Sequence, residues 1–127
     1  MNHPVHEPAG RDLADYLVEL SQVKQAENPV ILDLREYPAA AQWYVICEAD
    51  NVVHTRAVAE WIRSELKQRF GVFPARIEGY EDGRWVCVDY IDVVIHIMLP
   101  EIRDYYSIEE IWNKSNSTTP PPSHNRD

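Results

Sequence analysis

Apolar residues near the start of the chain recur three and four positions apart, which is the spacing of one face of a helix. The pattern covers residues 11–28, and Pro29 prevents the helix from continuing. We expect Asp12 to cap its amino end. The helix is therefore predicted to be amphipathic and about four turns long. Its apolar positions are Leu13, Tyr16, Leu17, Leu20 and Val23.

The longest helical pattern lies between residues 52 and 70, where an apolar residue returns every four positions. Asp50 or Asn51 precedes the pattern and is a suitable amino-terminal cap. Gly71 follows it and favours a stop, because glycine readily adopts the left-handed backbone conformation that ends many helices. The stripe consists of Val58, Ile62, Leu66 and Phe70.

Between and after these helices the apolar pattern is that of strands, with β-branched runs or a period of two. Two runs precede the second helix, and three follow it in quick succession. Glu81-Asp82-Gly83 is typical of a hairpin turn. The last three runs are therefore predicted to form an antiparallel meander that joins the earlier strands. The five runs are residues 29–34, 43–49, 75–80, 84–89 and 92–99.

Two short helices are expected at the end of the ordered chain, over residues 100–106 and 107–112, with Ser107 and Glu110 as a capping box. The order of elements predicts one α+β domain, a mixed sheet of about five strands flanked by helices. We expect this domain to span residues 11–113. The Pro-containing residues 1–10 and the polar, Pro-rich residues 114–127 are expected to be flexible.

Charge narrows the class of partner. The chain has 12 basic and 21 acidic residues and a net charge of −9. A protein that neutralises nucleic-acid phosphates needs clustered lysine and arginine, so a basic protein is the better expectation. No apolar run is long enough to span a membrane, and residues 1–12 lack the features of a secretory or transit signal. We expect a cytoplasmic protein.

Carboxylates near strand ends raise the possibility of catalysis. Asp33, Asp89 and Asp92 lie in or beside predicted strands, as in nucleotidyltransferases, where paired acids hold Mg²⁺. That chemistry needs two carboxylates two residues apart and a Gly-rich turn for the phosphates. Asp89 and Asp92 are three apart, and the four glycines form no such turn. The pattern argues against an enzyme, although a nucleotidyltransferase-like enzyme or a nucleotide-binding protein remains the alternative.

Histidines offer little for a metal site. His3 and His6 lie in the flexible terminus without a third ligand nearby, and no cofactor is expected. His96 lies within the last strand pattern, on the face that carries Val94 and Met98. A single histidine in that position is more typical of a hydrogen-bonded structural residue than of a ligand.

Binding of a partner is the remaining class of function. Alternation along residues 84–89 directs Trp85, Cys87 and Asp89 to one side of the strand and Val86, Val88 and Tyr90 to the other. Tyr105 and Tyr106 follow on the next helix. Tryptophan, tyrosine and arginine often carry the binding energy of interfaces. The alternative is that these aromatic side chains only fill the core.

Residues 78–112 together resemble the ribosomal silencing factor family, also called the Iojap family. The resemblance lies in a Glu-Gly pair, a tryptophan that leads a strand into Asp-x-x-Asp, a histidine-containing strand, an acidic-x-Arg-x-x-Tyr segment and a final apolar-Trp pair. Upstream, the leucine-rich first helix, the strand with Asp33 and the VIC strand also match. These motifs are Glu78-Gly79, Trp85, Asp89, Asp92, His96, Glu101, Arg103, Tyr106 and Ile111-Trp112.

The resemblance implies a nucleotidyltransferase-like fold without the catalytic residues. It also implies binding to the large ribosomal subunit through that subunit's ribosomal protein fourteen. This would block association with the small subunit and lower translation under nutrient limitation or in stationary phase. Some members of the family look like homodimers, so a dimeric scaffold with no ribosomal role is a further alternative. The expected partner-binding residues are Trp85, Asp89 and Tyr106 at the centre, with Tyr90, Asp92, Arg103 and Tyr105 around them.

Three segments depart from the family pattern. Ala41-Gln42 replaces a usual Thr-Asp, and residues 48–50 replace a turn with serine or threonine and glycine. These two changes argue against an inherited nucleotide site. Ile91 stands where a glycine is common between the two aspartates. Since isoleucine tolerates a positive φ poorly, we expect it to alter the hairpin.

Overall fold

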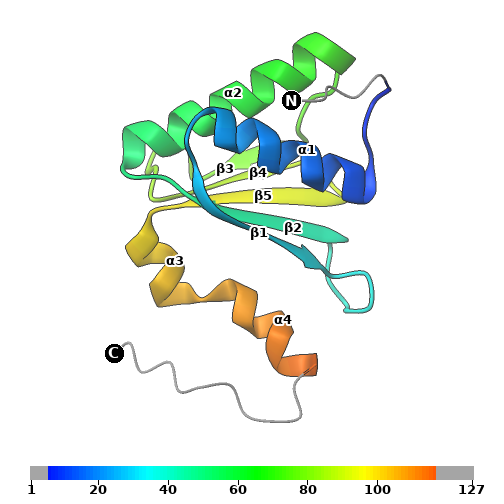
Figure 1. The fold of residues 1–127 in the computed structure, drawn as a ribbon, viewed down its shortest axis with the longest axis vertical. Helices are drawn as coiled ribbons and strands as arrows, with labels where there is room; N and C mark the ends of the chain where they lie inside the picture. Colours follow the sequence, from blue (N-terminus) through cyan, green and yellow to red (C-terminus); the bar gives the residue numbers. More distant parts are fainter. Residues whose placement is uncertain (1–5, 117–127) are drawn as a thin grey trace.

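The computed structural model of the chain describes residues 6–116, and their side chains as far as residue 112. A five-stranded sheet forms the middle layer, with α1 and α2 on one face and α3 and α4 on the other (Figure 1). The predicted single α+β domain with a mixed sheet is confirmed. Within the described residues, no helix is long and apolar enough to cross a membrane.

The strand order in the sheet is β1-β2-β5-β4-β3. Neighbouring strands run antiparallel except for β2 and β5, which are parallel and unite the front of the chain with the predicted meander. Four of the five predicted runs contain a strand, and the first overlaps β1, which begins two residues before it. The strands are β1 Glu27–Asp33, β2 Trp43–Glu48, β3 Arg76–Glu78, β4 Trp85–Asp89 and β5 Val93–Met98.

Helix α1 spans Gly10–Val23 and is shorter than predicted at its carboxyl end. The chain turns after it, with Gln25 at a φ of 65°, and has already entered β1 at Glu27, so Pro29 lies within the strand and does not end the helix. Asp12 is not the cap. It lies in the first turn, and Ala9 occupies the capping position without a side-chain hydrogen bond.

Helix α2 spans Val52–Phe70 and has both predicted ends. The Asn51 side chain accepts a hydrogen bond of 2.9 Å from the backbone N–H of His54. Gly71 closes the helix at a φ of 67°, and its N–H donates to the carbonyl of Lys67. Local chemistry therefore determines both boundaries of this helix.

The face of the sheet beneath α1 and α2 is a closed apolar core. The predicted helical stripes point into it, except that Val23 is exposed. The strands contribute alternate residues to it, as the period of two requires. Fully buried strand residues on this face are Val45, Cys47, Val86, Val88, Val93, Ile95 and Ile97.

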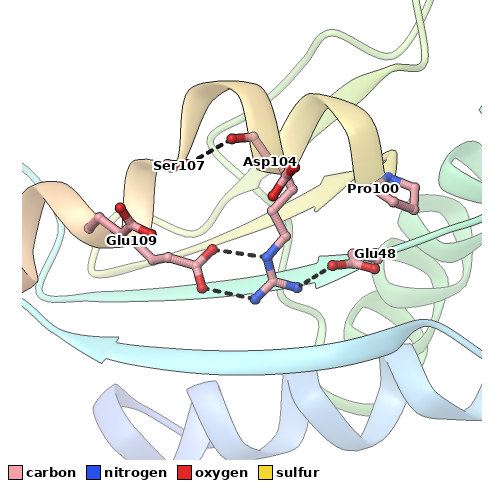
Figure 2. A pocket seen from close by; sticks show the side chains of 7 residues that line it. Glu48, Pro100, Asp104, Ser107 and Glu109 are labelled. Atoms are coloured by element: carbon pink, nitrogen blue, oxygen red, sulfur yellow. Dashed lines mark hydrogen bonds and ion pairs between the residues drawn. The ribbon is translucent and has the colours of Figure 1, made fainter. Parts of the chain in front are cut away.

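The opposite face is covered by α3, Pro100–Tyr106, and α4, Ile108–Asn116. Arg103 joins this layer to the sheet. Its guanidinium donates to both carboxylate oxygens of Glu109 in α4, at 2.9 and 3.1 Å, and to Glu48 of β2 at 3.1 Å (Figure 2). It also donates to the backbone carbonyl of Asn28 at 2.6 Å. Arg103 is only 8% exposed, so this cluster fixes the helices internally.

The expected limits of the domain shift slightly at both ends. Helix α4 begins directly after Ser107 and continues to Asn116, so residues 114–116 of the expected flexible tail are helical. At the front, Pro8 is buried and Gly10 is already in α1. The remaining parts of the expected flexible ends, residues 1–5 and 117–127, lie outside the described residues, as does His3.

Ile91 occupies the turn between β4 and β5 at a φ of 74°. Isoleucine adopts this conformation without interrupting the pairing, since β4 and β5 pair in continuous register up to Asp89 opposite Val94. The Asp89 side chain accepts a 2.7 Å hydrogen bond from the Ile91 N–H and supports the turn. The unfavourable conformation is thus held by its surroundings.

Candidate protein-binding surface

Trp85, the first residue of β4, lies on the face of the sheet covered by α3 and α4. Its side chain is half-buried, and its ring centroid lies 5.1 Å from that of Tyr106 at the end of α3. Trp85 is therefore neither a core residue nor a freely projecting one. It can stay fixed while part of its ring remains available to a partner.

Aromatic rings continue from Trp85 in both directions. Tyr106 packs edge-on against Tyr105 at 4.9 Å, and these tyrosines are 51% and 78% exposed. On the other side, the His96 ring lies 6.0 Å from Trp85, and Tyr44 lies 4.4 Å from His96. The row is thus buried at its centre in the sheet and open to solvent at the end of α3.

The predicted carboxylates flank this row at the far end of β4. Asp89 points to the same face as Trp85, and its side chain is 18% exposed. One oxygen accepts from the Ile91 N–H and the other lies 3.7 Å from Arg76. Asp92 is exposed in the next turn. Asp89 is therefore partly committed to its own chain, whereas Asp92 is open to solvent.

Tyr90 and Arg103 are more deeply buried than the other predicted partner-binding residues. Tyr90 is 9% exposed and belongs to the core on the opposite face, under α1 and α2. Arg103 is 8% exposed and is engaged by Glu48 and Glu109. Their positions suit support of the surface from within, not direct contact with a partner.

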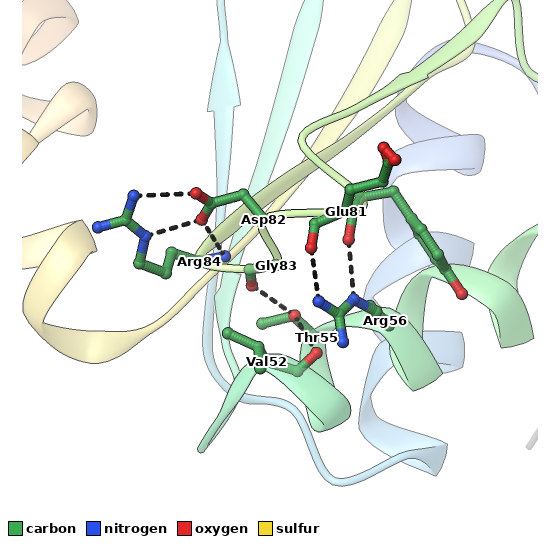
Figure 3. Close-up of polar contacts among 8 residues, drawn as sticks. Val52, Thr55, Arg56, Glu81, Asp82, Gly83 and Arg84 are labelled. Carbon is green, nitrogen blue, oxygen red and sulfur yellow. Dashed lines mark hydrogen bonds and ion pairs between the residues drawn. The ribbon is translucent and has the colours of Figure 1, made fainter.

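A second set of contacts fixes the hairpin that leads into Trp85. Arg56 of α2 donates to the carbonyls of Tyr80 and Glu81, at 2.9 and 2.6 Å, and Thr55 donates to the carbonyl of Gly83 at 2.6 Å (Figure 3). A Cβ at Gly83 would lie 2.7 Å from that of Val52. The turn can approach α2 this closely only with glycine.

Beside Trp85 the surface is hollowed between this hairpin and α3. The hollow has a volume of about 270 Å³. Within it Arg84 pairs with Asp82 through two hydrogen bonds of 2.7 and 2.9 Å, so neither charge is uncompensated there. The hollow thus offers mainly aromatic and aliphatic surface. Its lining consists of Gly79, Asp82, Arg84, Trp85, Ile102 and Tyr106.

The carboxylates considered for catalysis do not form a pair. Asp33 is in register with Trp43, which faces the core under α1, whereas Asp89 is in register with Val94 on the opposite face. Asp33 instead forms two hydrogen bonds with the Arg35 side chain, which lower the pKa of its carboxyl to about 2. In residues 6–116, no three His, Cys, Asp or Glu side chains are grouped to hold a metal ion.

Cys87 and His96 lie together, with Cys87 Sγ at 3.3 Å from His96 Nδ1. Burial raises the pKa of the Cys87 thiol to about 12 and lowers the pKa of His96 to about 4. At neutral pH both groups are therefore uncharged, and the pair lacks the thiolate of a nucleophile. Cys47 is fully buried, as its apolar run indicates, and its pKa is also raised by burial to about 12.

Sequence reasoning missed several residues that shape this surface. Tyr44 and Trp112 pack edge-on at 6.4 Å, and the Tyr37 hydroxyl donates to the carbonyl of Trp112 at 3.1 Å. The signal for Tyr44 was its alternation with the buried Trp43 and Val45. The contacts of Tyr37, which joins the loop after β1 to α4, had no signal because its partner is far away in sequence.

Comparisons with known proteins indicate one family. Residues 7–127 match the family model described as "Ribosomal silencing factor during starvation". A protein named ribosomal silencing factor RsfS from Halalkalibacterium halodurans is 31% identical over 104 residues, 82% of this chain and 88% of that protein. A mouse protein named "Mitochondrial assembly of ribosomal large subunit protein 1" is 30% identical over 77% of this chain and 44% of its own length.

Solved structures agree with the sequence comparison. A crystal structure of a Chromobacterium violaceum protein superposes with a TM-score of 0.78 at 28% identity, over 94% of this chain and 98% of that chain. A second crystal structure, from Bacillus halodurans, has a TM-score of 0.70 at 30% identity, over 81% of this chain and 95% of that chain. The described fold is therefore shared with these proteins.

Proposed function

This chain belongs to the ribosomal silencing factor (RsfS) family, and from that premise we propose that it binds the large ribosomal subunit through that subunit's ribosomal protein fourteen. Bound there, it blocks association with the small subunit and so represses translation when nutrients are limiting or in stationary phase. The observation that carries the proposal is the open end of the aromatic row, formed by Trp85, Tyr105 and Tyr106 beside a hollow.

The chemistry of this surface suits a basic protein. Partly exposed tryptophan and tyrosine side chains supply rigid contact area, which is where interfaces concentrate their binding energy. At the far end of β4, Asp92 is exposed and Asp89 retains 18% exposure. The net charge of −9 also favours approach to a positively charged partner over approach to the ribosomal phosphates.

The centre of the binding surface is tested by sedimentation of the protein with purified large subunits. Trp85→Ala and Tyr106→Ala should each weaken co-sedimentation roughly thirtyfold, because truncating a central aromatic residue costs about 2 kcal/mol or more. Phe73→Ala is the matched control, since Phe73 is also an exposed aromatic, at 62%, but lies in the loop after α2.

The far-ultraviolet circular dichroism of each variant must remain native for this test to be valid. If Trp85→Ala folds and binds as tightly as the wild type, the binding surface is elsewhere. If Phe73→Ala weakens binding as much as Trp85→Ala, the loss is not specific to the aromatic row.

The mode of inhibition is tested with purified subunits. Protein added before the subunits are mixed should inhibit their joining, whereas protein added to already joined ribosomes should leave most of them intact. A steric blocker requires its site on the large subunit to be exposed. Equal loss of preformed ribosomes would contradict simple occlusion.

A further inference from the structure

The indole of Trp85 is anchored by a hydrogen bond to the sheet beneath it. Its Nε1–H donates a hydrogen bond of 3.0 Å to Nδ1 of His96. The indole nitrogen can only donate, so Nδ1 must be the acceptor and the proton of the neutral imidazole lies on Nε2. The contact thus fixes the tautomer of the histidine as well as the direction of the indole.

The sheet holds His96 rigidly. It lies in β5 between β2 and β4, opposite Ile46 on one side and Cys87 on the other, and is only 6% exposed. Trp85 is two residues before Cys87, so Trp85 and His96 are diagonal neighbours on one face. The Tyr44 ring packs against the imidazole at 4.4 Å. The acceptor is therefore fixed by the least mobile part of the fold.

Trp85 itself has much weaker constraints on its outer side. Its ring lies against Tyr106, which is 51% exposed and is the last residue of α3. Apart from the packing of the rings, the bond to His96 orients the indole, with Cys87 Sγ beside it at 3.3 Å from the same Nδ1 atom. An indole that is already oriented loses less conformational freedom when a partner binds.

We propose that His96 is a positioning residue, which holds the Trp85 indole in the orientation that binds the ribosomal partner without touching that partner itself. This inference rests on the proposed function. It assigns a specific task to the buried histidine, namely to supply a hydrogen-bond acceptor at Nδ1.

Three variants separate this task from a general structural role. His96→Leu removes the acceptor at similar volume, and His96→Asn places an amide oxygen near the position of Nδ1. Trp85→Phe retains a ring but removes the donor. His96→Leu should weaken binding to large subunits roughly fivefold to tenfold, the effect of losing one oriented hydrogen bond, and His96→Asn should restore most of it.

Coupling between the two residues is the decisive measurement. In a Trp85→Phe background, which has no donor, His96→Leu should cause little further loss of binding. A purely structural role of His96 would instead add its full effect in both backgrounds. If the two losses add, the positioning role is overturned.

Nuclear magnetic resonance of the indole N–H groups gives a readout independent of the ribosome. The Trp85 resonance, assigned by its absence in Trp85→Phe, should exchange slowly with solvent in the wild type and in His96→Asn. In His96→Leu it should shift and exchange faster. An unchanged resonance would contradict the anchor.

The two proposals fail in different ways. If Trp85→Ala does not weaken binding, the proposed surface fails whatever the indole resonance shows. If Trp85→Ala weakens binding but a folded His96→Leu variant binds normally, only the positioning role fails. Should His96→Leu not fold, Trp85→Phe gives the same test alone, since wild-type binding by that variant would show that the bond to His96 is dispensable.

Discussion

The two faces of the sheet are built differently, although β2, β4 and β5 contribute to both. Beneath α1 and α2, the inward residues of these strands are buried and mostly valine and isoleucine, with Trp43 and Cys47 from β2. Beneath α3 and α4, the same strands present Tyr44, Trp85 and His96, which are joined by ring contacts and a hydrogen bond, and Asp89, which supports the next turn. The first face provides stability through apolar burial, and the second trades part of that burial for oriented polar and aromatic groups.

This division explains how a small domain can carry a binding surface without a deep cleft. The core face needs no special geometry beyond close packing. The second face depends on individual contacts, such as the Arg103 cluster, and single substitutions there should affect specific properties. The following predictions test the distinction, from the largest expected effect to the smallest.

Ile95→Ala should lower the free energy of unfolding by about 4 kcal/mol, because the side chain is fully buried on the central strand and its removal leaves a cavity. Val94→Ala, one residue earlier and on the other face, should cost about 1 kcal/mol, since Val94 is half-buried. Urea unfolding followed by circular dichroism measures both. Equal losses would contradict the difference between the faces.

Arg103→Met should lower the free energy of unfolding by about 3 kcal/mol, because it leaves the carboxylates of Glu48 and Glu109 partly buried without their cation. Hydrogen exchange should accelerate mainly in α3 and α4. The control is Arg84→Met, which removes an arginine paired with Asp82 at 61% and 54% side-chain exposure and should cost under about 0.5 kcal/mol. A similar loss in both variants would mean that burial of the pair is unimportant.

Lowering the pH should destabilise the protein through His96. Burial lowers its folded pKa from 6.5 to about 4, while the nearby Asp89 carboxylate opposes this shift. The unfolded state therefore takes up the proton first. The stabilising contribution is fully present above pH 6.5 and is lost as the pH falls towards 4, by up to about 3 kcal/mol.

Other groups also titrate in this window, so the prediction concerns a difference between variants. The neighbouring Cys87 and Tyr44 do not ionise there. His96→Asn should show a loss of stability between pH 7 and pH 4 that is smaller than that of the wild type by about 2 to 3 kcal/mol. The same pH dependence in both proteins would show that His96 is not the group responsible.

Ile91→Gly should raise the free energy of unfolding by roughly 0.5 to 1 kcal/mol, because relief of the left-handed conformation outweighs the entropy that glycine loses on folding. Ile91→Ala is the control, since alanine keeps the Cβ and should give no such gain. Thermal unfolding of the three proteins measures the difference. A glycine variant less stable than the alanine variant would show that the turn is not strained.

The core face could be predicted from sequence because its rules are local and periodic. The stripe of α2, its Asn51 cap and the alternation of Val86 and Val88 all follow from spacing. The end of α1 could not be predicted as well. Its pattern fades gradually, and the chain turns at Gln25 through a backbone conformation that sequence does not reveal in a non-glycine residue.

On the second face, sequence showed which residues share a side but not which of them meet. Alternation placed Trp85, Cys87 and Asp89 on one side of their strand and identified His96 as a hydrogen-bonded residue, which the structure confirms. It did not distinguish the exposed Tyr106 from the buried Arg103. That distinction depends on Glu48 of β2 and Glu109 of α4, which the fold brings together around Arg103.

The parallel pairing of β2 with β5 has a consequence for the order of folding. It joins residues about fifty positions apart, with Trp43 opposite Val93, whereas the other strand pairs join neighbours in sequence. Closing this long loop costs more chain entropy than forming the hairpins. We therefore expect the two antiparallel units to form early and to dock late. In stopped-flow experiments, Ile46→Val, at the centre of the parallel pair, should mainly accelerate unfolding and barely slow folding. A comparable slowing of folding would show that the two units meet before the rate-limiting barrier.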